Sequence, residues 1–235
     1  MSVEGAPVTL ITGTSRGIGR HLAEHFAGLG HVVVGCSRRD AEWSVAGYRH
    51  TVLDSRDEAA VVHLFKEIRI DHGRLDHLIN NAGIASMNHI LTTPMDTVRQ
   101  VLETNVTAPF LFAREGAKLM MKRRFGRIVN FSSIAVPLKL EGEAAYAASK
   151  AAVETLTGVL ARDLASFGIT VNGVGPAPID TALIRGVPDE KMQALLDRLP
   201  LSEFGTPDDV ANVVDFFIRP ESRAVTGQVL YLGGA

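Results

Sequence analysis

Short apolar runs alternate with longer amphipathic stretches along the whole chain, and this alternation restricts the fold more than any other feature. Runs typical of buried strands lie at Val8–Thr12, His31–Cys36, Thr51–Leu53, Leu75–Ile79, Arg127–Phe131, Ile169–Val174 and Gln228–Leu232. Helical periodicity is found at Gly17–Leu29, Asp57–Asp71, Met95–Arg124, Ala144–Phe167 and Pro207–Ile218. Because strand–helix–strand units join parallel strands through right-handed crossovers, the pattern predicts an α/β fold: a mostly parallel, seven-stranded sheet with helices on both faces.

The chain offers no place for a domain boundary. No internal repeat and no linker rich in proline, glycine or serine divides it, so residues 1–235 are expected to form one domain. One connection is unusually short. The segment from Arg39 to His50 is close to the lower limit for a complete helical crossover, roughly 10–12 residues. We therefore expect the helix between the second and third strands to be short or missing.

The composition excludes several classes of protein. Lysine and arginine number 24 against 26 acidic residues, and the net charge of −2 argues against a nucleic acid or an anionic membrane as partner. The single cysteine, Cys36, excludes an intrachain disulfide and a multi-cysteine metal site, and no metal is predicted. No apolar run reaches the roughly 18 residues of a membrane span, and Met1–Pro7 lacks the basic region of a secretory signal. We expect a cytoplasmic protein.

A glycine-rich loop follows the first predicted strand and runs into a helix. It reads Thr12-Gly13-Thr14-Ser15-Arg16-Gly17-Ile18-Gly19. Glycines permit the tight turn and bring backbone amides close to a ligand, and the helix N-terminus that follows favours an anion. The loop is therefore a candidate pyrophosphate site, and an ordinary glycine turn is the alternative.

The end of the second predicted strand carries basic residues and no acid. Ser37, Arg38 and Arg39 occupy it, and the first acid is Asp40. In a doubly wound dinucleotide-binding fold this end faces the adenosine ribose, where an acid selects NAD and an arginine selects NADP. Arg16 is a second candidate cation. The pattern favours NADP, with a solvated pair of arginines as the alternative.

Tyr146 and Lys150 lie four residues apart in a helical pattern and so share one face of the helix. An isolated tyrosine is a poor acid or base at neutral pH, and a nearby ammonium favours its ionised form. Alone this spacing is weak evidence for a catalytic pair, because any helix can carry it on a solvated face. It gains weight from Ser133 and from Asn80–Gly83, which follow two predicted strands at the edge of the sheet where α/β proteins bind ligands.

Together these motifs resemble the short-chain dehydrogenase/reductase family, with a doubly wound Rossmann domain, over nearly the whole chain. The resemblance rests on the glycine loop, Asn80–Gly83, Asn105, Ser133, and the pair Tyr146 and Lys150. It implies that Tyr146 is the general acid, that Ser133 binds the substrate oxygen, and that Lys150 binds the nicotinamide ribose and lowers the pKa of Tyr146. Asn105 would position a water in a proton relay.

The resemblance also implies a nicotinamide cofactor, and the ending at Ser37 and Arg38 resembles the NADP-preferring branch. Asp54 would accept a hydrogen bond from the adenine amino group. The cofactor-binding positions carried over are Gly13, Ser15, Arg16, Gly17, Ile18, Gly19, Ser37, Arg38, Asp54, Asn81, Ala82, Gly83, Tyr146, Lys150, Pro176, Ile179 and Thr181. Trp43 would cover the adenine side or, as the favoured interpretation, pack over the sheet.

The sequence departs from the family after the sixth strand, where Ala177 stands in place of a glycine. The substrate loop is expected at about residues 179–204, and its stripe of Met192, Leu195, Leu196 and Leu199 either lines the substrate pocket or packs the loop. Residues 134–143 form the other expected wall. There Glu141 and Glu143 contact a polar substrate or are solvated, and His89 is expected at the surface.

The overall pattern is similar to 3-oxoacyl-[acyl-carrier-protein] reductases. The basic run Lys122–Arg124 fits an acidic carrier protein, whereas Phe167 stands where such reductases often have a basic residue. An NADPH-dependent carbonyl reductase acting on a small ketone is equally supported. An NAD-linked alcohol dehydrogenase and a non-catalytic regulator that binds the cofactor are the alternatives.

Two long helical stretches carry more apolar residues than one sheet can cover. In Ala144–Phe167, the apolar residues Ala148, Ala151, Ala152, Leu156, Val159 and Leu160 span a wide arc, and Thr104–Arg124 is similar. The family resemblance implies that these helices pair across a two-fold axis. We expect a homotetramer, with a monomer as the alternative.

Overall fold

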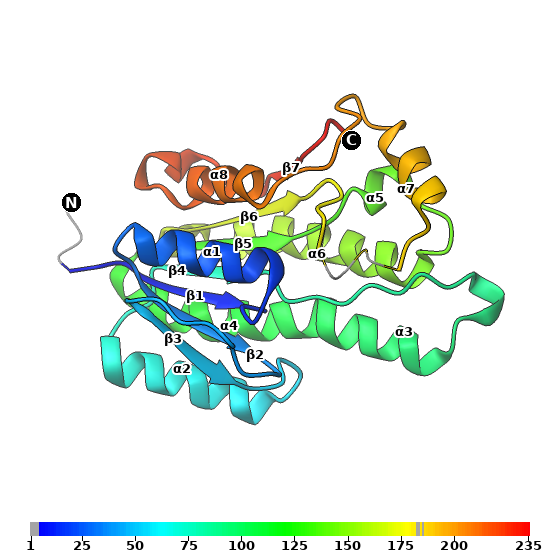
Figure 1. Ribbon diagram of the computed structural model, residues 1–235. Helices are drawn as coiled ribbons and strands as arrows, with labels where there is room; N and C mark the ends of the chain where they lie inside the picture. The colour runs from blue at the N-terminus through cyan, green and yellow to red at the C-terminus, as the bar shows by residue number, and fades with distance from the viewer. Residues whose placement is uncertain (1–4, 182–183, 185) are drawn as a thin grey trace.

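Seven parallel strands form one twisted sheet in the computed structural model, which describes residues 5–181, 184 and 186–235 (Figure 1). The strands are β1 (Val8–Thr12), β2 (Val32–Ser37), β3 (Tyr48–Val52), β4 (His77–Asn80), β5 (Gly126–Phe131), β6 (Ile169–Gly175) and β7 (Val229–Tyr231). Their order across the sheet is β3-β2-β1-β4-β5-β6-β7, and every neighbouring pair is parallel. The predicted α/β fold is confirmed.

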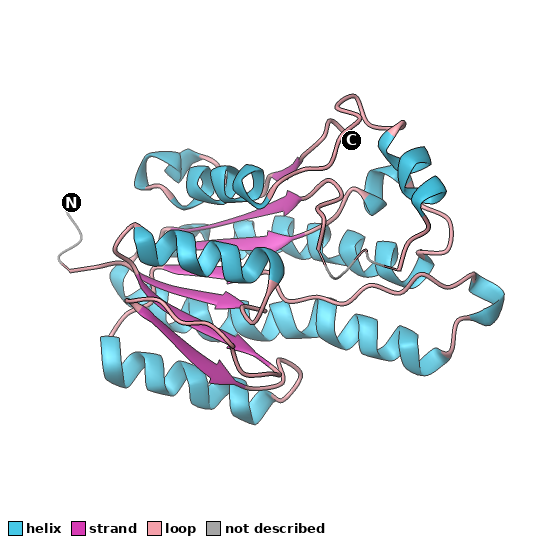
Figure 2. Cartoon of the chain, viewed as in Figure 1, coloured by secondary structure: helices cyan, strands magenta, loops and turns pink. Residues whose placement is uncertain are grey.

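Helices cover both faces of the sheet (Figure 2). The α-helices are α1 (Gly17–Gly28), α2 (Glu58–His72), α3 (Met95–Leu102), α4 (Ala108–Met120), α5 (Ala135–Leu138), α6 (Ala144–Leu164), α7 (Asp189–Leu196) and α8 (Pro207–Ile218). Short 3-10 helices lie at Ile90–Thr92, Met121–Arg123, Ala165–Phe167 and Pro220–Ala224, and a π-helical turn at Glu103–Thr107 joins α3 to α4.

The two faces of the sheet form two apolar cores. On one face α1 and α8 pack on side chains that include Ile11, Val33 and Val129. On the other face α2, α4 and α6 pack on the adjacent strand residues, whose side chains point the opposite way, such as Leu10 and Ile128. Successive residues of a strand point to opposite faces, so a strand covered on both sides must be apolar almost throughout. This explains why the central strands were readable from the sequence.

Most elements differ from the predicted ones by one or two residues at an end, and two differ more. β3 begins at Tyr48 rather than at Thr51, and pairs with β2 along its whole length. It is one of the two edge strands and is half-buried, and its polar residues do not match a pattern of apolar runs. The predicted helix over Met95–Arg124 is interrupted by the π-helical turn.

Residues 38–47, all of which the structure describes, form turns and no helix, so the missing helix between β2 and β3 is confirmed. Trp43 packs back from this segment. Its ring stacks on Tyr48 with centroids 4.3 Å apart, and its Nε1 donates to the Thr14 carbonyl at 3.2 Å. Within the described part of the chain, no helix is long and apolar enough to cross a membrane.

Candidate active site

An open cleft of about 1410 Å³ lies at the carboxyl ends of the strands. The segments that follow β1, β2, β4, β5 and β6 all contribute lining residues, as does the N-terminal part of α6. In a parallel sheet all carboxyl ends meet at one edge, where ligands bind in α/β proteins. The topology therefore gathers into one cleft the motifs that lie far apart in the sequence.

The glycine loop forms one end of the cleft and has no room for side chains at two positions. A Cβ atom at Gly19 would lie 2.2 Å from the Gly13 carbonyl oxygen, and one at Gly13 would lie 2.9 Å from Asn81 Nδ2. Gly13 and Gly17 also have positive φ angles of 78° and 60°. Arg16 precedes α1 with no side-chain cap. The first amides of α1 are therefore available for an anion, so the residues present fit a bound pyrophosphate.

Uncommitted positive charge surrounds this end of the cleft. Arg16, Arg38 and Arg39 all line it, and within the described part of the chain none of the three is in an ion pair. The Ser37 hydroxyl donates to the Arg39 carbonyl at 2.5 Å, which folds the turn after β2. A phosphate monoester is the ligand that such a group of guanidinium and hydroxyl donors suits best.

A hydrogen-bonded group behind this turn was not foreseen from the sequence. His50 lies 3.2 Å from Ser37 Oγ and 3.0 Å from the Arg39 carbonyl through Nε2, and 2.6 Å from the Tyr48 hydroxyl through Nδ1. The Tyr48 hydroxyl in turn donates to Thr14 Oγ1 at 2.8 Å. The group connects the glycine loop to the basic turn. The sequence feature that could have revealed this group is the i, i+2 spacing of Tyr48 and His50, which places both side chains on one face of a strand.

The structure does not bring Asp54 into the cleft with the other predicted cofactor residues. Leu53 and Ser55 line the cleft, and Asp54 does not. Its carboxylate accepts from the Arg56 side chain at 2.6–3.2 Å and from the Arg56 amide at 3.0 Å. The hydrogen bonds from Arg56 lower the pKa of the Asp54 carboxyl. Its adenine-binding role stays a prediction.

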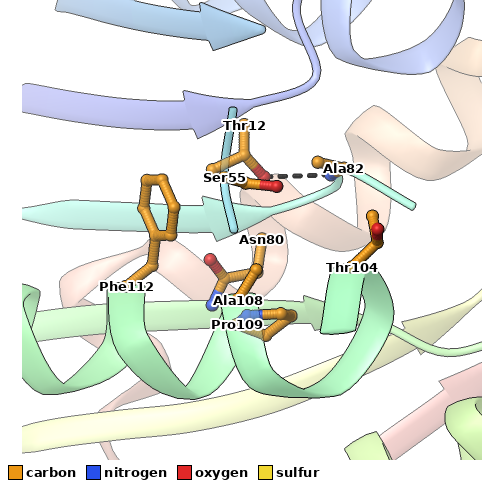
Figure 3. A pocket seen from close by; sticks show the side chains of 8 residues that line it. All are labelled: Thr12, Ser55, Asn80, Ala82, Thr104, Ala108, Pro109 and Phe112. Carbon is orange, nitrogen blue, oxygen red and sulfur yellow. Dashed lines mark hydrogen bonds between the residues drawn. The ribbon is translucent and has the colours of Figure 1, made fainter. Parts of the chain in front are cut away.

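A second, small pocket lies where β1, β4 and α4 meet, and Figure 3 shows the contact that closes one side of it. Thr12 Oγ1 accepts from the Ala82 amide at 2.9 Å. Asn81 Nδ2 donates to the Thr12 carbonyl at 2.8 Å. These bonds tie the Asn80–Gly83 segment to the end of β1, so that its backbone forms a fixed wall of the main cleft.

Asn105 lies behind the cleft wall, in the π-helical turn. Its Oδ1 accepts from the Ile84 amide, and its Nδ2 donates to the Ile84 carbonyl, both at 2.9 Å. Nδ2 also donates to Ser149 Oγ at 3.0 Å, and Ser149 Oγ donates to the Tyr146 carbonyl at 2.6 Å. Asn105 thus links the segment after β4 to the helix that carries Tyr146. Ile84 and Ser149 were missed in the sequence.

Tyr146, Lys150 and Ser133 come together at the centre of the cleft. Tyr146 is 9 % exposed, and Lys150 Nζ lies 5.8 Å from the centroid of its ring. Nζ donates to the Phe131 carbonyl at 2.7 Å. Burial raises the pKa of Tyr146, and the neighbouring Ser133 hydroxyl offsets part of that rise.

Burial is the largest influence on the pKa of both Tyr146 and Lys150 in the cofactor-free chain, and the expected lowering of the Tyr146 pKa by Lys150 stays a prediction. Loss of water raises the pKa of Tyr146 to about 12, and the same loss lowers the pKa of Lys150 to about 8. The ammonium is directed to the Phe131 carbonyl rather than to the phenol oxygen. Tyr146 is therefore a neutral phenol at neutral pH, able to donate a proton beside a serine hydroxyl.

Comparison with known proteins agrees with this geometry. The sequence model described as enoyl-(acyl carrier protein) reductase matches residues 13–234. The chain is 33 % identical over 240 residues to a 3-oxoacyl-[acyl-carrier-protein] reductase from Escherichia coli K12, covering 100 % of this chain and 98 % of the relative. It belongs to the short-chain dehydrogenase/reductase family. A reductase of the same name from Staphylococcus aureus is 35 % identical, with 96 % of each chain covered.

The fold of this short-chain dehydrogenase/reductase is also close to that of a solved structure. The ligand-free aldohexose dehydrogenase from Thermoplasma acidophilum superposes with a TM-score of 0.90 at 31 % identity, covering 97 % of this chain and 93 % of that one. The chain is accordingly an oxidoreductase with a family-typical, Rossmann-like sheet.

On the substrate side, the family departure at Ala177 is accommodated by packing. Ala177 is buried in a small apolar cluster with Ile134, Leu196 and Leu199, and a Cβ at Gly233 would lie 3.2 Å from its methyl group. Gly233 therefore leaves the space that the extra methyl needs. Pro176, Ile179 and Thr181, which the sequence predicts as cofactor-binding residues, line the cleft nearby.

The apolar stripe of the predicted substrate loop divides between two roles. Met192 and Leu195 line the cleft, whereas Leu196 and Leu199 are buried in the cluster around Ala177. Both interpretations of the stripe therefore hold for different residues. His89 is exposed and also lines the cleft, as do Glu141 and Glu143.

The basic run Lys122–Arg124 lies at the end of the sheet opposite to the cleft. It directly precedes β5, so it is at the amino ends of the strands, whereas the cleft is at the carboxyl ends. Arg124 donates to the Ser166 carbonyl at 2.8 Å, and Phe167 packs against the larger core. Within one chain this patch does not adjoin the cleft.

Proposed function

We propose that this chain reduces a carbonyl group to an alcohol with NADPH as the hydride source. One observation carries the proposal: a buried, protonated Tyr146 lies beside Ser133 and Lys150 in the same cleft as the glycine loop and the arginines that form no ion pair with a described residue. One half of the cleft suits a phosphorylated dinucleotide, and the other half offers a proton and a hydrogen bond to a substrate oxygen.

The cofactor half would be held by backbone and charge. The first amides of α1 would bind the pyrophosphate, and Arg16 and Arg38 would bind the 2′-phosphate. Lys150 would turn from the Phe131 carbonyl to the nicotinamide ribose, and Pro176, Ile179 and Thr181 would contact the carboxamide. NADP(H) supplies the hydride when it is bound.

The chain's own residues would manage charge and protons. Ser133 would hydrogen-bond the carbonyl oxygen, and Tyr146 would protonate that oxygen as negative charge develops on it. Lys150 would stabilise the tyrosinate left behind, because an ammonium favours a neighbouring anion. Asn105, fixed by Ile84 and Ser149, would position a water through which Tyr146 regains its proton.

Two candidate substrate classes follow from the relatives. The bacterial reductases named for 3-oxoacyl-[acyl-carrier-protein] favour a carrier-bound 3-oxoacyl thioester, and the aldohexose dehydrogenase favours a small polyhydroxylated molecule. A small-molecule ketone is supported by the position of Lys122–Arg124 at the edge away from the cleft. An NAD-linked alcohol dehydrogenase is disfavoured by Arg16 and Arg38, and a non-catalytic regulator by the assembled Tyr146 site.

We further propose that residues 1–235 act as one domain within a homotetramer with two-fold symmetry. The proposal of a tetramer is supported by apolar side chains that a single chain leaves exposed on the two long helices. Phe110 on α4 is 49 % exposed, and Val159 on α6 is 50 % exposed. Exposed apolar patches on several faces of long helices are typical of subunit interfaces.

Turnover assays test the proposal. Oxidation of NADPH and of NADH is followed with a panel that contains small ketones and an acetoacetyl thioester. We expect ketone-dependent oxidation of NADPH that is faster than that of NADH at equal concentration. Absence of turnover with every carbonyl compound would support the non-catalytic alternative, and equal use of both cofactors would contradict the NADP preference.

A further inference from the structure

The Glu143 side chain places a carboxyl group in the substrate half of the cleft, where it binds no other described side chain. It lines the cleft together with Tyr146 and Ser133 and is half-buried. It occupies the N-cap position of α6, but its side chain accepts no capping hydrogen bond. Within the described part of the chain it is in no ion pair and no side-chain hydrogen bond. Burial raises the pKa of its carboxyl group.

Glu143 lies close to the reacting group. It is the N-cap residue of α6, three residues before Tyr146, and both side chains line the cleft. Burial is the main cause of the raised pKa of Tyr146, and the negative charge of Glu143 raises it further, so the two groups are neighbours. A substituent next to a carbonyl that Tyr146 protonates is therefore placed to meet Glu143.

A half-buried carboxyl group without a partner is costly against an apolar ligand and favourable against a hydrogen-bond donor. An unsubstituted acyl chain beside Glu143 would remove its remaining water and return no hydrogen bond. On the substrate side the cleft lining carries three cations, Lys139, Lys191 and Arg198, against the two acids Glu141 and Glu143, so it offers no excess of negative charge to a ligand ammonium. A neutral hydroxyl group satisfies the carboxyl without adding charge.

Resting on the proposed function, we propose that Glu143 is a specificity-determining residue that selects hydroxylated carbonyl compounds, by accepting a hydrogen bond from a hydroxyl group next to the carbonyl. The substrate class is thus a hydroxy ketone or a small carbohydrate rather than an unsubstituted ketone or 3-oxoacyl chain. A site built to bind a substrate hydroxyl discriminates strongly against the analogue that lacks it, because its own polar group then stays unpaired.

Matched pairs of ketones test the proposal. Hydroxyacetone and butanone differ only by a hydroxyl in place of a methyl group, as do dihydroxyacetone and diethyl ketone. We expect the wild type to reduce the hydroxylated member with a kcat/KM at least about tenfold higher, the effect of one hydrogen bond to a charged group. Glu143→Met should remove the preference and raise activity on butanone. Glu143→Gln, which keeps an acceptor of the same shape, should retain part of it.

Asp163→Asn is the matched control, because it removes an exposed carboxylate from the far end of the same helix and should leave the preference intact. Equal kcat/KM for both members of each pair in the wild type, or a preference that survives in Glu143→Met, would overturn the inference while the reductase function stands. Acetoacetyl-N-acetylcysteamine is assayed in parallel, and faster reduction of this thioester than of hydroxyacetone would also overturn it. No NADPH oxidation with any of the five compounds would overturn the proposed function itself, and the inference with it.

Discussion

Tyr146 and Lys150 respond in opposite directions to the same loss of water. Burial disfavours the charged form of each, which raises the pKa of the phenol to about 12 and lowers that of the ammonium to about 8. In the cofactor-free protein the Tyr146 phenol is therefore protonated at neutral pH. In the proposed reaction, reduction would use this protonated tyrosine, whereas oxidation would require its deprotonated form. The cofactor-free site is thus in the protonation state that the proposed reduction requires.

Replacing Tyr146 by phenylalanine tests the proton donor. Tyr146→Phe keeps the ring and removes only the hydroxyl, so we expect kcat to fall by roughly 10²–10⁴, the usual contribution of a general acid. NADPH affinity, measured by fluorescence titration, should stay close to that of the wild type. A variant that kept a large share of wild-type kcat would show that another group donates the proton.

The charge of Arg38 should determine which cofactor is used. Arg38→Asp removes a cation from the proposed 2′-phosphate site and adds an anion, and charge-assisted hydrogen bonds contribute roughly 1.5–3 kcal/mol each. We expect the ratio of kcat/KM for NADPH to that for NADH to fall at least about tenfold. Arg123→Asp, at the opposite edge of the sheet, is the control and should leave this ratio unchanged. An unchanged ratio in Arg38→Asp would place the phosphate elsewhere.

At the scale of elements, the sequence predicted what burial on two faces imposes. β1 was located to the residue because both of its faces are covered and it is buried throughout. β3 was shortened because it is a polar edge strand. The π-helical turn at Glu103–Thr107 was missed because the residues on both sides of it stay helical and the turn contains no glycine or proline.

Within the site, linear motifs located the residues that touch the cleft and missed the residues that hold them. Tyr146, Lys150 and Ser133 were found from their spacing, whereas the partners of Asn105 were not, since Ile84 and Ser149 have no chemistry that marks them. Asp54 lies between two residues that line the cleft, Leu53 and Ser55, and no motif in the sequence marks the hydrogen bonds that hold its carboxylate to Arg56.

The junction of β2 with the glycine loop should tolerate no added methyl group. A Cβ at Gly35 would lie 2.4 Å from both Thr14 Oγ1 and the Tyr48 hydroxyl. Gly35→Ala should therefore lower the free energy of unfolding by about 1–3 kcal/mol, as overpacking does in well-packed regions. Urea unfolding measures the change.

Gly28→Ala is the matched control for Gly35→Ala. Gly28 ends α1, and no atom lies within 4 Å of its Cβ position. The same methyl group should there leave the stability unchanged or raise it by up to about 1 kcal/mol. Equal effects of the two substitutions would contradict the close packing around Gly35.

At the scale of the whole molecule, the two edges of the sheet differ in their ionisable groups. The cleft, with the buried Tyr146 and Lys150, is at the carboxyl edge, and a second group of buried ionisable side chains lies at the amino edge. There Arg74 forms a buried ion pair with Asp76 at 2.5 Å, and Thr9 Oγ1 lies 3.0 Å from His77 and 2.9 Å from His31. Burial and the nearby charges of Arg127 and Arg74 lower the pKa of His77 to about 3, and burial also lowers that of His31.

Acid should destabilise the molecule through His77. Its pKa is about 3 in the folded state and 6.5 in its ordinary state, so the unfolded chain binds more protons between these values. Stability should therefore fall as the pH drops below about 6.5, by about 1.4 kcal/mol per pH unit for this group. Urea unfolding at several pH values gives the slope, which His77→Gln should reduce.

His63→Gln is the control for this slope. The His63 side chain is 71 % exposed, so its replacement should leave the pH dependence of unfolding unchanged. A slope that is the same in His77→Gln as in the wild type would show that other groups cause the acid sensitivity.

Assembly can be tested on the uncovered apolar faces. Val159→Glu and Phe110→Glu place a charge on α6 and α4, and burying it in an interface would be costly. We expect light scattering to give a mass near four chains of 25.3 kDa for the wild type, and a smaller assembly for each variant. Val62→Glu, on a residue 42 % exposed on α2, should not change the mass. A wild-type mass of one chain would refute the tetramer and leave the catalytic proposal intact.

The separation of the two edges has a practical consequence for redesign. The groups proposed to set catalysis and selectivity, such as Tyr146, Arg38 and Glu143, line the cleft at the carboxyl edge, whereas His77 lies at the start of β4 on the amino edge. Mutations that are distant and share no partners usually have additive effects. An engineer could therefore extend the working range of the enzyme toward acid by replacing His77, and exchange the accepted carbonyl compound by replacing Glu143, as two independent steps.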